Sequence, residues 1–224
     1  MSKGEETRGR IVDRALRLAS KDGFEGLTIG SLAGDLGLSK SGLFAHFGSK
    51  DELQLQVLAA ATERFERDVV RPALAAPRGE PRLRAFFENW LAWGNDRSMP
   101  GGCVIIAAAI EFDDRPGPQR DFIVRSQQEW LATLAKAARL AVDEGHFRRD
   151  LDPHQFAFDL WASILGYHHA KRLLHEPHAE RWVRSAFERL VVQARSTITT
   201  TPYPIPKPPK LRSRSNTRGP RGRA

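Results

Sequence analysis

The chain has 224 residues, with 35 lysines and arginines against 27 aspartates and glutamates, and its only cysteine is Cys103. This length allows one large domain or two small ones. The longest wholly apolar run, residues 103–110, is far shorter than the ~20 residues that span a bilayer. The N-terminus has no apolar stretch typical of a signal peptide, and a single cysteine cannot form an intrachain disulfide. We therefore expect a cytoplasmic protein that does not bind a membrane.

The positive charge is concentrated at the C-terminal end. From Thr199 onward there are seven basic residues, six prolines and no acidic residue. The rest of the chain carries 28 basic against 27 acidic residues, so its net charge is close to zero. We predict that residues 199–224 form a disordered, basic, proline-rich tail. The net charge alone is no argument that the folded part binds DNA.

Apolar residues recur at helical spacing up to about Ser196, and no run alternates like a half-buried strand. The predicted fold class is therefore all-α. A first helix carries Ile11 and Leu16 on its inner face and ends at Gly23. Thr28 can cap a short helix that ends at Gly37, and Ser39 can cap another that runs through Phe44.

The remaining helices are longer. Ser49 and Glu52 predict a capping box that opens a long helix, which we expect Pro72 and Pro77 to close. Asp152 and Pro153 are a strong start signal further along the chain. Helices are expected near 81–97, 101–113, 118–144, 153–175 and 179–197.

Residues 28–50 carry the most informative motif. Two short predicted helices meet at a turn centred on Gly37, the small Ala33 lets them approach, and Leu38 and Leu43 fill the wedge between them. These are the requirements of a helix-turn-helix, whose second helix lies in the major groove of DNA. The N-terminal end of that helix presents Ser39, Lys40 and Ser41, and its free backbone N–H groups favour phosphate.

The same segment resembles the N-terminal domain of the TetR family of transcriptional regulators, through the Thr28 cap and the runs 32–33, 37–39 and 42–50. Phe44 stands where the family usually has a tyrosine that contacts a phosphate, so we expect Phe44 to pack or to place its ring on the DNA backbone. The resemblance implies double-stranded operator DNA as a partner. It also implies phosphate contacts by Thr28, His46 and Lys50, and a groove-facing surface made of Ser39, Lys40, Ser41, Gly42 and Leu43.

Members of the family usually sense a small molecule in their C-terminal domain. The second half of this chain is rich in aromatic residues, and an apolar cavity with a few polar groups suits a lipophilic ligand. Aromatic residues at helical spacing can equally form an ordinary core, and no charged group is clearly placed to bind an ionic ligand. The residues that we expect to line a ligand pocket are Trp90, Trp93, Cys103, Trp130, Trp161 and His168.

The resemblance also implies a homodimer. In the family the last two helices pair with their symmetry mates, and residues 100–118 resemble a segment that forms the helix between sensor pocket and DNA-binding domain in one branch. Burial within one subunit is the alternative for the apolar residues of the last two helices. The expected interface residues are Phe156, Leu160, Ile164, Trp182, Ala186, Phe187 and Leu190.

These observations predict a DNA-binding domain in residues 1–50, a helical ligand-binding and dimerisation domain in 51–198, and the tail. The predicted function is a repressor that a small lipophilic ligand releases from its operator. An activator or a ligand-independent regulator of the same fold remains an alternative, and an enzyme with Cys103 as nucleophile and His168 or His169 as base is a remote one. The apolar residues after Cys103 argue for burial, and the histidines lack metal-ligand spacing. We therefore expect no enzyme activity, cofactor or metal ion.

Overall fold

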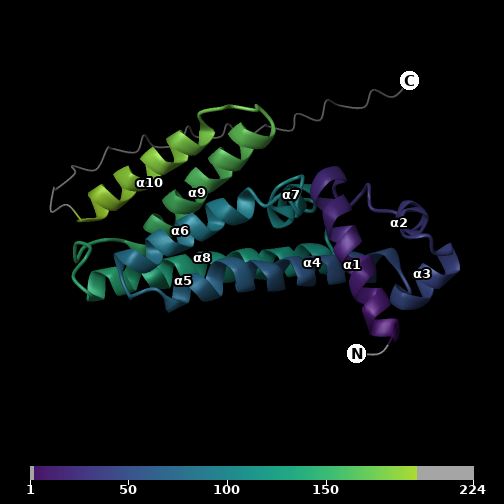
Figure 1. Cartoon of the computed structure of the whole chain (residues 1–224). Coiled ribbons are helices and arrows are strands. Elements are labelled where there is room, and N and C mark those ends of the chain that lie inside the picture. The colour runs from purple at the N-terminus through teal and green to yellow at the C-terminus, as the bar shows by residue number, and fades with distance from the viewer. Residues whose placement is uncertain (1–2, 196–224) are drawn as a thin grey trace, which may run out of the picture.

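A computed structural model of the chain describes residues 3–195, and within this range there are helices and no strand (Figure 1). Helices α1–α3 lie at one end of the molecule and α10 lies at the other. None of the described helices is apolar over a length that could cross a membrane. The predicted tail, residues 199–224, lies outside the described residues. The helices are α1 (Lys3–Asp22), α2 (Ile29–Leu36), α3 (Lys40–Phe47), α4 (Lys50–Phe65), α5 (Arg71–Ala75), α6 (Glu80–Gly94), α7 (Val104–Glu111), α8 (Pro118–Asp143), α9 (Pro153–Arg172) and α10 (Ala179–Arg195).

Side-chain caps define the helix-turn-helix where the sequence predicts it. The Thr28 hydroxyl accepts a hydrogen bond from Ser31 N at 3.0 Å, and Thr28 N donates to the Ser31 hydroxyl at 3.3 Å. Gly37 ends α2 in the left-handed region, with φ of +65°, which glycine adopts without a steric penalty. The Ser39 hydroxyl then accepts from Gly42 N at 3.0 Å and starts α3. The predicted start and end of α2 and the predicted start of α3 are confirmed, whereas α3 runs to Phe47, beyond the predicted Phe44.

The helix that begins at Ser49 runs further than predicted. The helical path continues beyond Pro72 to Ala75, so the expectation that Pro72 closes it is wrong. A π-helical turn, Glu66–Val70, connects α4 to α5. At its end, Arg71 N donates a hydrogen bond to the Glu66 carbonyl oxygen, five residues earlier. This wider turn relieves the clash that a proline ring makes with the carbonyl four residues before it. The path ends at Ala76, which is extended as expected for a residue before a proline.

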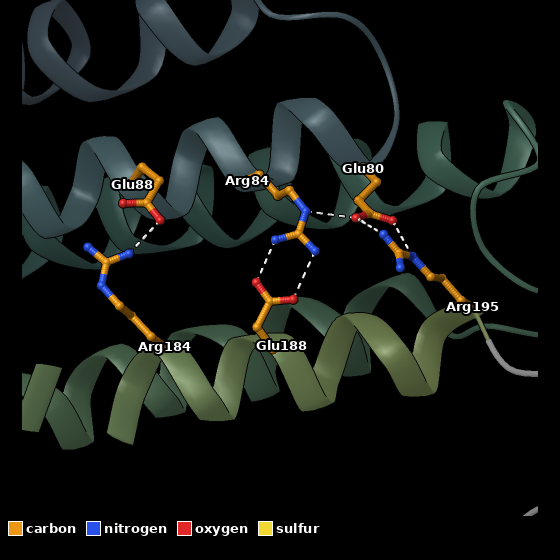
Figure 2. Close-up of polar contacts among 6 residues, drawn as sticks. All are labelled: Glu80, Arg84, Glu88, Arg184, Glu188 and Arg195. Carbon is orange, nitrogen blue, oxygen red and sulfur yellow. Dashed lines mark hydrogen bonds and ion pairs between the residues drawn. The ribbon is translucent and has the colours of Figure 1, made fainter. Parts of the chain in front are cut away.

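Helices α6, α8, α9 and α10 form the second half, in which α8 packs on α4 and α9, and α9 packs on α10. Phe87 of α6 stacks on Phe187 of α10, with ring centroids 4.1 Å apart. Ion pairs also join these two helices (Figure 2). Arg84 donates to both carboxylate oxygens of Glu188, at 2.6 and 2.9 Å. Glu80, which is buried, accepts from Arg84 and from Arg195.

The Glu80 carboxylate should make the stability of the protein sensitive to acid. Burial raises the pKa of the Glu80 carboxyl, but the hydrogen bonds from Arg195 and Arg84 lower it by more. The pKa of Glu80 therefore lies below its usual value. A carboxyl whose pKa is lower in the folded state stabilises the fold above its unfolded pKa, about 4.3, and loses this contribution as the pH falls through its folded value. We expect Glu80→Gln to lower the free energy of unfolding at pH 7 by ~1–3 kcal/mol.

Chemical denaturation from pH 7 to pH 3 would check this prediction. The difference between the parent protein and Glu80→Gln should shrink once the pH passes below about 4. Glu188→Gln is a matched control, because the Glu188 side chain is 55% exposed and exposed ion pairs contribute only about 0–1 kcal/mol. A difference that does not change with pH would mean that the variant loses packing rather than charge.

Candidate DNA interface, effector cavity and the joint between them

The side chains of α3 divide into a buried and an exposed set. Leu43 is fully buried in the wedge between α2 and α3, so the expectation that it also faces the groove is wrong. Phe47 is buried beside it. The exposed set contains Lys40, Ser41, Phe44 and Ala45, which follow one side of the helix over two turns. We call these four residues the reading surface.

The other residues expected at the DNA lie around the reading surface. Ser39 and Gly42 are exposed, and the Ser39 hydroxyl lies 3.2 Å from that of Ser41. Lys40 extends along α2, so that a Cβ atom added to Gly30 would lie 3.4 Å from Lys40 Cε. Thr28 is exposed at the start of α2. The structure therefore brings Lys40 close to the N-terminal turn of α2.

His46 and Lys50 lie at the other end of α3. His46 is half-buried, and its ring lies beside that of Phe47, with centroids 6.3 Å apart. The Lys50 ammonium donates to the Glu25 carbonyl oxygen at 3.4 Å, just before the Thr28 cap. Their contacts to phosphate, like that of Thr28, remain predictions.

Phe44 does not pack in the interior. Half of its surface is exposed, and within residues 3–195 its ring stacks on no other aromatic ring. The part of the expectation that placed Phe44 in packing is therefore corrected. About half of the Phe44 surface is therefore open to solvent where DNA is expected.

A polar joint connects the three N-terminal helices to the rest of the molecule. The Glu111 carboxylate, at the end of α7, accepts hydrogen bonds from Phe24 N at 2.8 Å and Glu25 N at 2.5 Å. The buried amide of Gln54 donates to the Phe24 carbonyl oxygen at 3.1 Å. Gln119 of α8 in turn donates to Gln54 at 3.0 Å. The peptide groups at the end of α1 are thereby held by α4 and α7 together.

The loop before α7 lies equally close to α1. Gly101 N donates to the Ser20 hydroxyl at 3.1 Å. A Cβ atom at Gly101 would lie only 1.3 Å from the Ser20 carbonyl oxygen, so only glycine allows this approach. The sequence gives no sign of this contact, because Ser20 and Gly101 are far apart along the chain.

A cavity of about 280 Å³ lies between α4, α5, α6, α8 and α9. Four of the six expected pocket residues line it, namely Trp90, Cys103, Trp130 and Trp161. The sequence missed the wall formed by the end of α4, the π-helical turn and α5. Further lining residues are Thr62, Phe65, Glu66, Val70, Arg71, Leu74, Ile105, Ser126, Gln127, Glu129 and Thr133.

The other two expected pocket residues do not line the cavity. Trp93 is buried behind it, where its ring meets that of Phe65 edge to face at 5.7 Å. His168 lies near Gly102, so that a Cβ atom there would be 3.1 Å from His168 Nε2. Burial, followed by the positive charge of Arg172, lowers the pKa of His168. His168 therefore lies beside the loop before α7, in surroundings that favour its neutral form.

Charged side chains do lie at the cavity, contrary to the expectation that none is clearly placed there. The π-helical turn brings Glu66 to the wall, 4.0 Å from Arg71. Glu129 lines the cavity from α8. These side chains are exposed, whereas Trp90 and Trp130 are buried. The cavity thus has an aromatic interior and a mixed-charge mouth.

The structure offers no support for catalysis by the cysteine. Cys103 is buried, and its burial raises the pKa of the thiol, which disfavours the nucleophilic thiolate. Within residues 3–195, no three His, Cys, Asp or Glu side chains lie close enough together to hold a metal ion.

The last two helices bury most of the residues expected at a dimer interface. Phe156, Leu160, Ile164 and Phe187 are all buried within the subunit, so their assignment to the interface is corrected. Leu190 is partly buried against the same core, and Ala186 is partly exposed. Trp182 alone among the expected residues is largely exposed. The exposed apolar residues of these two helices include Phe158 and Leu165 on α9, and Trp182 and Val192 on α10.

A capped helix-turn-helix with an exposed second helix, joined to a helical domain that holds a cavity, is the architecture of a DNA-binding regulator with a sensor domain. Two family profiles agree with this. Residues 11–57 match the bacterial regulatory proteins of the tetR family, and residues 79–187 match the tetracyclin repressor-like C-terminal domain. The chain belongs to the TetR family of transcriptional regulators.

Individual relatives agree. The chain is 31% identical over 145 residues to the transcriptional regulator TcmR of Streptomyces glaucescens. The matched region covers 61% of this chain and 62% of TcmR. It is 26% identical over 152 residues to SrpR of Pseudomonas putida, covering 67% and 68% of the two chains. The chain thus spans about three-fifths of the length of TcmR.

Solved structures share the fold. A TetR regulator from Chloroflexus aurantiacus superposes with a TM-score of 0.76 at 26% identity, covering 86% of this chain and 96% of that one. A regulator from Saccharomonospora viridis in complex with choline superposes with a TM-score of 0.69 at 25% identity, covering 82% and 95%.

Proposed function

We propose that this protein is a sequence-specific regulator that binds double-stranded operator DNA in the cytoplasm, and that it represses transcription until a small ligand releases it. The observation that carries the proposal is the reading surface on α3, presented by a helix that Leu43 and Phe47 anchor. Polar and apolar side chains on such a helix can reach base edges in the major groove. The domain boundary near residue 50 stays a prediction, because α4 packs on α1 as well as on α8.

The regulator acts as a homodimer. Two reading helices must meet half-sites about 34–36 Å apart, which a single subunit cannot do. The support is the pair of exposed apolar faces on α9 and α10, which carry Phe158, Leu165, Trp182 and Val192. Apolar side chains gathered on adjacent helices are typical of a protein interface.

The ligand binds in the cavity and acts through α7. Cys103 and Ile105, at the start of α7, line the cavity, and Glu111, at its end, holds Phe24 and Glu25. A ligand that favours a displaced α7 therefore also favours a displaced α1, and this lowers the affinity for operator by linkage. The aromatic interior suits a largely apolar molecule, and the choline complex of the S. viridis regulator supports a sensor function. The buried thiol argues against catalysis by Cys103.

Selection of bound DNA from random fragments, with the full chain, would test the proposal. We expect a palindromic site, and we expect Lys40→Ala to weaken binding to it by ~1–3 kcal/mol while leaving helical content unchanged. If Lys40 contacts a base, the loss should be confined to one base pair. If it contacts a phosphate, all sequences should be affected alike. Recovery of no preferred sequence would contradict the proposal.

Binding to the selected operator, measured with added compounds, tests the proposed release by a ligand. Apolar compounds that quench the fluorescence of the cavity tryptophans should also release the operator, because cavity and joint share α7. Gly34→Ala is a control for the DNA-binding half, since nothing lies within 4 Å of a Cβ atom there. A broad library of apolar compounds that neither quenches fluorescence nor releases DNA would contradict a ligand-released repressor.

A further inference from the structure

Phe44 is an aromatic residue held in solvent by the architecture of its own helix. Full burial of a phenylalanine side chain stabilises a protein by about 1.5–3 kcal/mol, so an exposed ring forgoes a large contribution. Leu43 and Phe47, both buried, fix the rotation of α3, and turning Phe44 inward would expose them. The ring is therefore presented outward whether or not DNA is bound.

The reading surface has a polar half and an apolar half. The polar half consists of Lys40 and Ser41 in the first turn of α3. The apolar half consists of Phe44 and Ala45, one turn and four residues further along the helix. The small Ala45 leaves the ring accessible from its side. No acidic residue belongs to this surface, so nothing on it repels DNA.

Within the major groove, the base edges offer hydrogen-bonding groups and one apolar group, the C5-methyl of thymine. A phenyl ring has no group that can hydrogen-bond to a phosphate, but it can bury a methyl group. We infer that Phe44, flanked by Ala45, contacts the methyl group of a thymine in each half-site and makes the protein selective for thymine there. This inference rests on the proposed binding of operator DNA.

Replacement of single thymines by deoxyuridine in the selected operator tests the inference, because it removes the methyl group and leaves base pairing intact. Burial of one methyl group is worth roughly a fourfold change in affinity. We expect about a fourfold loss at one thymine of the half-site and no loss at the others. In Phe44→Ala that position should become insensitive to deoxyuridine, whereas Ala45→Gly should stay sensitive.

Two results would overturn the inference while the proposed function stands. Tolerance of deoxyuridine at every thymine of a tightly bound operator would place the ring on the sugar–phosphate backbone. A Phe44→Ala protein that keeps the same deoxyuridine-sensitive position as the parent would also overturn the inference. Failure to select any preferred DNA would instead contradict the proposed function itself.

Discussion

Gly101→Ala is expected to lower the free energy of unfolding by about 3 kcal/mol or more, the upper end of the range for overpacked sites. The new Cβ atom would lie 1.3 Å from the Ser20 carbonyl oxygen and 2.0 Å from its carbon. Both are backbone atoms, so no side-chain rotation relieves the clash. Either the fold weakens or the loop before α7 moves away from α1. For a chain of this size the melting temperature should fall by roughly 6–12 °C.

The control for Gly101→Ala is Gly9→Ala. Gly9 lies within α1, nothing lies within 4 Å of a Cβ atom there, and alanine is the better helix former by about 0.5–1 kcal/mol. This variant should be at least as stable as the parent in chemical denaturation. Operator affinity should fall in Gly101→Ala only, because the joint also positions α1. A Gly101→Ala protein with the stability of the parent would show that the loop is not seated on Ser20.

Local signals explain why the DNA-binding helices could be predicted from sequence. The caps at Thr28 and Ser39 and the left-handed Gly37 are set by neighbouring residues, so the helix limits follow from the chain itself. Leu43 shows the limit of this reasoning. The same residue fits the wedge and the groove by spacing alone, and only its complete burial decides between them.

Long-range contacts explain what the sequence did not reveal. Glu111 and Gln54 are isolated polar residues whose partner, Phe24, lies far away along the chain in the turn after α1, and no local pattern marks them. One wall of the cavity depends on the π-helical turn that carries Glu66. The sequence pattern predicts a helix that ends at Pro72, and such an end leaves no place for this turn. On α10 the strongest apolar face belongs to the interior, where Phe187 stacks on Phe87, so the expected interface set combines inner residues such as Phe187 with the outer Trp182.

The corrected faces make a second prediction with a large effect. Phe158 is 62% exposed on α9, and Trp182 is 51% exposed on α10. If these faces pair two subunits, then the double variant Phe158→Glu with Trp182→Glu should be monomeric, because burying unpaired charges in an interface is costly. Loss of the second half-site contact should reduce operator affinity by roughly 10²–10⁴-fold.

Light scattering, circular dichroism and operator binding together test this prediction. The double variant should keep the helical content of the parent, since both side chains lie outside the core. Val124→Glu is the matched control, because Val124 is an exposed apolar residue on α8 outside the two faces, and this variant should remain dimeric. Phe187→Glu should behave differently from all of these, since it would bury a charge against Phe87 and unfold the second half. A parent protein that is monomeric at micromolar concentration, or a double variant that still dimerises, would contradict pairing through these faces.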